Sequence, residues 1–226
     1  MQFFSRNKEL SDPAIIVNSC LEFLFNRITD DLDREGYSWN KPWGVKRFES
    51  IVLAKFILDY SFEKIAEGQL AEEDKTGYYD LSDTSFSNMF NSEFSPVGMN
   101  FDDMQEGIRE KVDEYFKIRQ EYQRPPECYY QIYMLITGSQ SREEYEEEIK
   151  KKTVGLEFMR NNENFATMVK QYEIQINKMN QKVAAFDLAD IMLPHMFRSA
   201  RQKLKTINIK KIKVLSKKLA KKEIKK

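Results

Sequence analysis

Apolar residues recur every three or four positions along much of the chain, which is the spacing of helices that bury one face. The first such segment starts at Asp12 and Pro13, a pair typical of a helix start, and ends before Gly36, a residue typical of a helix end. The pattern predicts a helix between these points. Its inward positions are Val17, Leu21, Leu24, Ile28 and Leu32.

A second helix is predicted after a tryptophan-containing loop over residues 37–44, and it should run to about Glu73. Its apolar positions lie on more than one side, so we expect it to be central in the fold. These positions include Phe48, Ile51, Val52, Phe56, Phe62 and Ile65.

The helical spacing fails between Asp74 and Asn100, where Gly, Pro, Ser, Asp and Asn surround isolated aromatic residues. We expect a packed loop with a short helix near residues 85–91, because a structureless loop of this length is uncommon inside a compact domain. The rings either pin this loop to the core or line a pocket. They are Tyr78, Tyr79, Phe86, Phe90, Phe94 and Phe101.

Three further helices follow. One is predicted over residues 102–123 and stops at Pro125 and Pro126, and a short apolar one over residues 127–137 closes at Gly138. Ser141 and Glu144 then have the spacing of a capping box. In the helix that they open, residues 146–148 are glutamates and residues 150–152 are lysines, a spacing that favours ion pairs on a solvated surface.

The most regular pattern lies between residues 165 and 186, where seven apolar residues alternate at spacings of four and three. This is the pattern of a helix that packs along a seam. The partner is either another helix of the same chain or a second protomer, which would make a homodimer. The seam residues are Phe165, Val169, Tyr172, Ile176, Met179, Val183 and Phe186.

Pro194 follows the seam without a loop, so we expect the helix to kink there and continue. Residues 201–226 contain neither Gly nor Pro and combine an apolar stripe with many lysines, which predicts a basic amphipathic helix. The predicted fold is all-α: an irregular helical bundle with a long C-terminal helix kinked at Pro194 and a basic amphipathic end. We divide it into an acidic helical body, residues 1–160, and a long helix with a cationic arm, residues 161–226.

The composition agrees with a globular, mainly helical protein. Of the 226 residues, 41% are hydrophobic and 13% aromatic, which is too many for a disordered chain. The charged fraction is 32%, and 8 Gly with 6 Pro are few for a turn-rich β protein.

The formal net charge of zero hides a strong separation of charge. Residues 198–226 hold 13 of the 36 basic residues and one of the 36 acidic ones, so this end carries +12 and the rest of the chain −12. Such a distribution bears on partners and solubility more than on fold.

The basic end predicts binding to an anionic partner. Lysines outnumber arginines and no aromatic residue follows Phe197, so we expect contacts to a phosphate backbone rather than base reading or stacking. We therefore expect a non-catalytic interaction protein that binds nucleic acid or ribonucleoprotein with little sequence specificity. An anionic membrane surface or an acidic protein, including the chain's own body, fits the same helix. The binding residues would be Arg198, Arg201, Lys203, Lys205, Lys210, Lys211, Lys213, Lys217, Lys218, Lys221 and Lys222.

Catalytic signatures are sparse. The single histidine, His195, has only Asp187 and Asp190 nearby in sequence as possible partners, and the chain lacks GxSxG, GxGxxG, P-loop and CxxC motifs. We expect no catalytic residue, no metal ligand and no cofactor. One alternative is a metal-dependent α-helical enzyme that uses clustered acids at Asp30, Asp31, Asp33 and Glu35 with Asp102, Asp103 and Glu106.

A second alternative is an inhibitor or immunity-type module that binds a protein through the acidic, aromatic-rich body, with Glu143, Glu144, Glu147, Tyr78 and Tyr79 as its contacts.

The location is predicted from absent signals and from the thiols. The sequence shows no signal peptide and no membrane span, and Cys20 and Cys128 lie on apolar helix faces. We expect a cytoplasmic protein with two reduced, structural cysteines.

Overall fold

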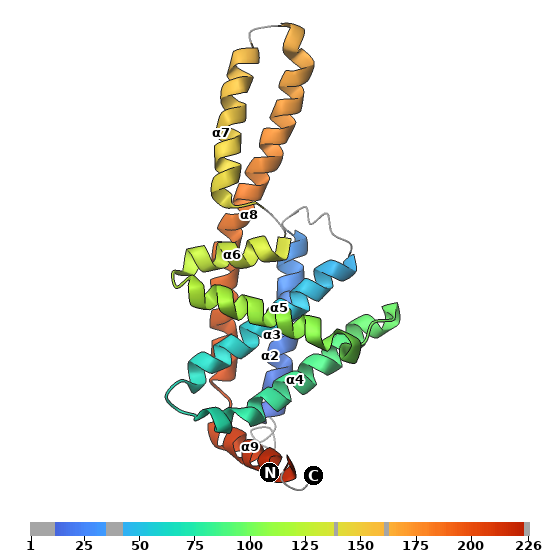
Figure 1. Ribbon diagram of the computed structural model, residues 1–226, viewed down its shortest axis with the longest axis vertical. Coiled ribbons are helices and arrows are strands. Elements are labelled where there is room, and N and C mark those ends of the chain that lie inside the picture. The colour runs from blue at the N-terminus through green and yellow to red at the C-terminus, as the bar shows by residue number, and fades with distance from the viewer. Residues whose placement is uncertain (1–11, 35–42, 138–139, 161–162, 224–226) are drawn as a thin grey trace, which may run out of the picture. The chain divides into compact units, whose positions relative to one another are not determined.

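The computed structural model describes residues 12–34, 43–137, 140–160 and 163–223 (Figure 1). These ranges contain eight α-helices, two short 3₁₀ helices and no strand, so the predicted all-α fold class is confirmed. The helices are α2 (Pro13–Arg34), α3 (Trp43–Ala66), α4 (Glu72–Phe94), η1 (Ser95–Val97), α5 (Phe101–Glu121), α6 (Pro125–Thr137), α7 (Arg142–Met159), η2 (Glu163–Phe165), α8 (Ala166–Leu204) and α9 (Ile209–Glu223).

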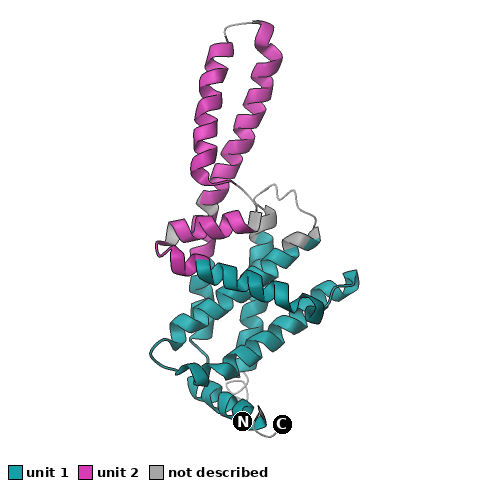
Figure 2. Cartoon of the chain, viewed as in Figure 1, with its two compact units in different colours: residues 1–31, 40–117, 195–226 teal, residues 32–39, 118–194 magenta. Residues whose placement is uncertain are grey.

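The chain forms two compact units (Figure 2). Unit 1 comprises residues 1–31, 40–117 and 195–226, and unit 2 comprises residues 32–39 and 118–194. This division differs from the one predicted at residue 160, because the C-terminal helices join the N-terminal ones in unit 1 while α7 joins the first part of α8 in unit 2.

Helix α2 begins as predicted. The Asp12 carboxylate accepts a hydrogen bond from the Ala14 backbone N–H over 3.0 Å, which satisfies one of the donors left open at a helix start. Four of its five predicted inward residues are buried: Val17, Leu21, Leu24 and Ile28. The Leu32 side chain and Gly36 lie outside the described residues.

Helix α3 is the centre of unit 1, as its apolar pattern predicts. Every residue from Glu49 to Asp59 is buried, so neighbouring elements cover this part of the helix on all sides. Phe56 lies at the middle, and its ring centroid is 5.1 Å from Phe116 of α5 and 5.9 Å from Phe197 of α8. The predicted end near Glu73 is wrong, because the helix ends at Ala66 and Gly68 turns the chain with a φ of +73°.

The loop predicted between Asp74 and Asn100 is wrong, because α4 occupies most of this range. Four aromatic residues and one serine recur every fourth position and form a buried stripe on one face of the helix. Ser82, one of the small polar residues that break the apparent pattern, is part of this stripe, and Ser85 is buried as well. The stripe consists of Tyr78, Ser82, Phe86, Phe90 and Phe94.

Unit 2 contains the two predicted boundaries at prolines and at a capping box. Helix α6 starts at Pro125, and Gly138 lies outside the described residues. At the start of α7, the Glu144 N–H donates to the Ser141 hydroxyl over 3.2 Å and the Ser141 N–H donates to the Glu144 carboxylate over 2.9 Å. This reciprocal pair confirms the capping box.

Two of the ion pairs predicted on α7 are present. Lys151 lies 2.9 Å from Glu147 and Lys152 lies 3.5 Å from Glu148, while Glu146 pairs instead with Arg142 at 2.8 Å. Such pairs on a solvated surface contribute little to stability, because water and salt screen them.

Helix α8 is 39 residues long and contains Pro194 in its interior. It therefore continues past the proline and ends at Leu204, ten residues later along the chain. A proline has no backbone N–H to donate to the carbonyl four residues before it, so the Asp190 carbonyl lacks its usual helical donor. This interruption coincides with the boundary between the two compact units.

Candidate functional site

The basic C-terminal segment is part of unit 1 and packs on its other helices. A turn over residues 205–208 separates α8 from α9, and the Asn208 side chain accepts a hydrogen bond from the Lys210 N–H over 3.0 Å at the start of α9. The single helix predicted over residues 201–226 is therefore wrong in this respect. Helix α9 packs on α4, and Ile212 and Ser216 are buried in that contact.

The two helices approach closely at Gly77 of α4. A Cβ atom at this position would lie 2.7 Å from the Ser216 backbone nitrogen and 2.8 Å from the Ile212 carbonyl oxygen. The Gly77 N–H donates to the Ser216 hydroxyl over 2.8 Å, and this hydroxyl donates to the Asp74 carbonyl oxygen over 2.7 Å. Glycine is thus required here by the close backbone approach.

An ion pair also joins α9 to α4, because Lys213 lies 3.1 Å from the Asp74 carboxylate. Of the partners considered for the basic end, the chain's own acidic body is therefore one that it contacts. The pair engages one of the lysines of α9 and is partly exposed, so its energetic contribution is small.

The opposite side of α9 carries the exposed lysines. Because 3.6 residues make one turn, positions 210, 218 and 221 lie about opposite Ile212 and Ser216, and the other three flank them. The face is about 20 Å long for this 15-residue helix. We call it the lysine face, and it consists of Lys210, Lys211, Lys217, Lys218, Lys221 and Lys222, all exposed.

The remaining predicted binding residues lie near the end of α8. Arg198, Arg201 and Lys205 are exposed and follow the helical spacing of one face. Lys203 is only partly exposed, and its ammonium nitrogen lies 4.8 Å from the centroid of the Phe23 ring, in a cation–π contact. Lys203 and Lys213 therefore hold the segment in place, whereas the others face solvent.

The predicted seam meets two helices of unit 2: Tyr172 contacts Lys152 of α7, and Phe186 packs on Tyr130 and Tyr133 of α6. Six of its seven residues are partly buried and Phe186 is fully buried. Polar contacts border it, since Lys152 donates to Gln175 over 2.9 Å and Arg160 lies 3.1 Å from Glu173. The seam thus meets a helix of the same chain, while a homodimer through it stays a prediction.

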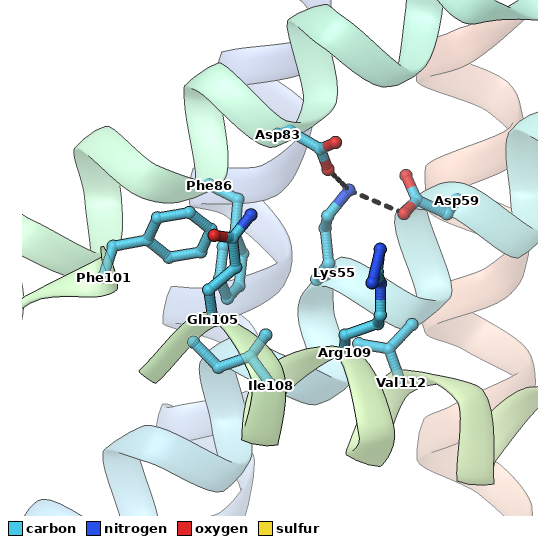
Figure 3. A pocket seen from close by; sticks show the side chains of 9 residues that line it. All are labelled: Lys55, Asp59, Asp83, Phe86, Phe101, Gln105, Ile108, Arg109 and Val112. Atoms are coloured by element: carbon cyan, nitrogen blue, oxygen red, sulfur yellow. Dashed lines mark hydrogen bonds and ion pairs between the residues drawn. The ribbon is translucent and has the colours of Figure 1, made fainter. Parts of the chain in front are cut away.

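A pocket of about 180 Å³ lies in unit 1 between α3, α4 and α5 (Figure 3). Its residues come from three separate helices, so no spacing along the sequence predicts it. One part of its wall is charged and the other is mainly apolar. The lining residues are Lys55, Asp59, Asp83, Phe86, Phe101, Gln105, Ile108, Arg109 and Val112.

Lys55 is the centre of the charged wall. Its ammonium group lies 2.7 Å from each of the Asp59 and Asp83 carboxylates and donates to the Ser82 hydroxyl over 2.8 Å, so all three of its N–H bonds have partners. Burial disfavours the charged form of Lys55, but the two carboxylates outweigh it and raise the pKa of this lysine above its ordinary value of 10.5.

The rings predicted to line a pocket or a protein-binding face are mostly internal. Tyr78 is fully buried and stacks on Phe62 with ring centroids 3.5 Å apart, and Tyr79 is partly buried with its hydroxyl on Glu63. Phe86 and Phe101 line the pocket described above. Glu143, Glu144 and Glu147 are exposed on α7.

The other candidate residues are scattered. His195 is exposed on α8, and Asp102, Asp103 and Glu106 are exposed on α5. Within the described ranges no three His, Cys, Asp or Glu side chains are grouped closely enough to hold a metal ion. The side chains of Asp31 and Asp33, and all of Glu35, lie outside those ranges.

Comparisons with known proteins give no relative of this chain. No protein-family model, no curated protein sequence and no solved structure matches it significantly. A search of the described helices for a segment with the length and apolar character of a membrane span found none.

Proposed function

We propose that the protein is a non-catalytic binding protein whose lysine face on α9 binds the phosphate backbone of nucleic acid. The observation that carries the proposal is the presentation of six exposed lysines on a helix whose other side is fixed to α4 by Gly77 and Ser216. A docked helix has already lost its conformational freedom, so binding does not have to order it.

The chemistry of this face favours backbone contacts. A lysine ammonium is a compact point charge that neutralises a phosphate, whereas bidentate recognition of bases is typical of arginine. The face contains no aromatic residue on which an unpaired base could stack. Binding should therefore depend weakly on sequence and strongly on salt.

Arg198 and Arg201 extend the basic surface along the chain into the last turns of α8, and Lys205 lies in the turn that follows. Because they are exposed and precede α9 by a short turn, they are the next contacts that we assign to nucleic acid, in free form or in a ribonucleoprotein. We place this activity in the cytoplasm, in keeping with two buried, unpaired thiols.

The experiment uses charge variants rather than a truncation. Removing residues 198–226 would take buried residues such as Leu204, Ile207 and Ile212 out of unit 1, so lost binding would not separate charge from folding. Lys217→Gln with Lys221→Gln removes two charges from the lysine face only. Lys170→Gln with Lys178→Gln is the matched control, because both lysines are exposed on α8 in unit 2.

Binding to a short mixed-sequence DNA duplex and to an RNA of equal length is measured by fluorescence anisotropy at several salt concentrations. We expect the lysine-face variant to bind more weakly and the slope of log affinity against log salt to fall by about 0.9 for each lost phosphate contact on duplex DNA. The control should bind like the wild type. Unchanged affinity and slope in the lysine-face variant would contradict the proposal.

A further inference from the structure

The pocket between α3, α4 and α5 is built from charges that are already balanced. Lys55 and Arg109 contribute two positive charges, and Asp59 and Asp83 contribute two negative ones. Lys55 and Asp59 form the inner pair, with side chains that are 8% and 7% exposed. Their charges neutralise each other inside the wall.

Within the inner pair, every N–H of Lys55 and both carboxylate oxygens of Asp59 have a partner. The three N–H bonds of Lys55 go to Asp59, Asp83 and Ser82, and the second oxygen of Asp59 accepts from the Ser82 hydroxyl over 2.7 Å. This network orients the Asp83 carboxylate, which Lys55 contacts through one oxygen only. The Asp83 side chain is 66% exposed, so its other oxygen is accessible.

Two further polar groups line the pocket from α5. The Arg109 guanidinium and the Gln105 amide have no hydrogen-bond or ion-pair partner among the described residues. A pocket ligand therefore meets one anion, Asp83, one cation, Arg109, and one neutral amide. Figure 3 shows the charged side chains at one part of the pocket and the aromatic ones at another.

The rest of the wall is apolar. Phe86 and Ile108 are buried, Phe101 and Val112 are partly buried, and the Phe86 and Phe101 rings meet edge to face with centroids 5.8 Å apart. Burying one aliphatic or aromatic ligand side chain here would contribute favourably in proportion to the apolar area removed from water.

The volume limits the ligand to a small molecule. A pocket of about 180 Å³ is slightly larger than an engineered apolar cavity of about 150 Å³ that takes up benzene. Drug-sized ligands occupy pockets of about 300 Å³ or more. The occupant should therefore combine both charges and an apolar group within a few bonds of one another.

We propose that this pocket binds a small zwitterion of the α-amino acid class with an apolar side chain. The ligand carboxylate binds the Arg109 guanidinium in a charge-assisted hydrogen bond, and the ligand ammonium binds the free oxygen of Asp83. The apolar side chain packs on Phe86, Phe101 and Ile108. The site is independent of the lysine face on α9.

The probes are L-leucine, N-acetyl-L-leucine, which keeps only the carboxylate, and L-leucinamide, which keeps only the ammonium. Calorimetry and thermal shift on the full chain should show L-leucine binding with a Kd of about 1 mM or tighter. Each blocked analogue should bind about 10- to 100-fold more weakly, because it loses one of the two charge-assisted hydrogen bonds, to Arg109 or to Asp83.

The variants make the assignment specific. Arg109→Gln should make L-leucine and L-leucinamide bind equally, and Asp83→Asn should do the same for L-leucine and N-acetyl-L-leucine. Glu110→Gln is the control for a lost charge on an exposed position of α5 and should change nothing. Val112→Phe keeps every charge and fills the pocket, so it should abolish binding by sterics alone.

Two results would overturn the proposal. One is the absence of any heat or thermal shift with L-leucine and with the other apolar amino acids at about 10 mM, roughly ten times the weakest expected Kd. The other is binding that persists in Val112→Phe, because the ligand would then lie elsewhere on the protein. Circular dichroism of each variant verifies that it is folded.

Discussion

Gly77 of α4 and Ser216 of α9 are in direct contact, since the Gly77 N–H donates to the Ser216 hydroxyl over 2.8 Å. The two residues are 139 positions apart in the sequence, so this bond ties the end of the chain to its first half. The same hydroxyl donates to the Asp74 carbonyl oxygen, which places it between two backbone groups of α4.

The first prediction concerns the space at Gly77. Gly77→Ala should lower the free energy of unfolding by about 1–3 kcal/mol, because the new methyl group would overlap with backbone atoms of α9 that cannot move aside as a flexible side chain would. This is the net change, because the overlap costs more than the gain of about 1 kcal/mol that alanine brings to a helix interior. Chemical denaturation followed by circular dichroism measures it.

Gly107→Ala is the matched control within α5, because no atom lies within 4 Å of the position that its Cβ would occupy. At position 107 only the helix preference of alanine over glycine acts. The free energy of unfolding of this variant should therefore rise by up to about 1 kcal/mol. Equal and positive effects at both glycines would show that α9 does not lie against α4 in solution.

The fold could be predicted wherever one local rule decided the structure. The Asp12 cap, the capping box at Ser141 and the end of α5 before Pro125 depend on neighbours in sequence, and all three are present. The central position of α3 follows from apolar residues on more than one side of it. These signals survive folding because no distant contact competes with them.

Helix α4 was missed because two of its residues were read by their local preference alone. Gly77 is a poor helix former, although the approach of α9 requires glycine there, and Ser82 interrupts the apolar spacing, although it is buried with Lys55 and Asp59. Tertiary context outweighs intrinsic preference at both positions. The recurrence of Tyr78, Phe86, Phe90 and Phe94 at multiples of four was the signal that could have identified the helix.

The candidate site was predicted only in part. The lysines of α9 are readable as a charge pattern, and Asn208 is a cap residue that could have predicted the separate helix. The pocket could not be predicted, because Lys55, Asp83 and Arg109 come from three helices and one of those was expected to be a loop. Which residues face one another across helices is set by their three-dimensional arrangement.

The second prediction concerns Lys55. Lys55→Met should lower the free energy of unfolding by about 3 kcal/mol or more, because it leaves the buried Asp59 carboxylate without its cation. Lys64→Met is the control in the same helix, since the Lys64–Glu67 pair is exposed, and it should cost about 0.5 kcal/mol or less.

The pH dependence follows from the raised pKa of Lys55. Because the pKa of the folded state lies above the ordinary value of 10.5, the charged lysine stabilises the fold fully below that pH, and this stabilisation is lost as the pH rises through the folded-state pKa. The stability difference between wild type and Lys55→Met should stay constant from about pH 7 to about pH 10 and narrow above it. A stability difference between the two proteins that widens at high pH would contradict the predicted direction.

The third prediction concerns the two thiols. Burial raises the pKa of Cys20 to about 12 and also raises the pKa of Cys128, and both side chains are fully buried. Since the thiolate is the reactive form, neither cysteine should react with a thiol reagent at neutral pH until the protein unfolds. An absorbance assay with a disulfide reagent, with and without guanidinium chloride, measures this.

Asn177→Cys provides the positive control for accessibility, because position 177 is exposed on α8. That thiol should react at once in the folded protein, while Cys20 and Cys128 stay protected. Rapid reaction of one native thiol in the wild type would mean that the helix carrying it opens readily under native conditions.

The last prediction uses trypsin, which cuts after lysine and arginine, to distinguish a docked α9 from a free cationic arm. A free arm with so many lysines would be cut immediately, whereas a helix held by Ile212 and Ser216 must first open before the protease can bind its backbone. The wild type should therefore lose α9 slowly. Gly77→Ala should lose it much faster, with cuts inside residues 210–222 identified by mass spectrometry, while Gly107→Ala behaves like the wild type. Cleavage of α9 at the same fast rate in all three proteins would show that the lysine face is carried by an undocked segment, and the salt-dependent binding proposed for it would then include the cost of ordering that segment.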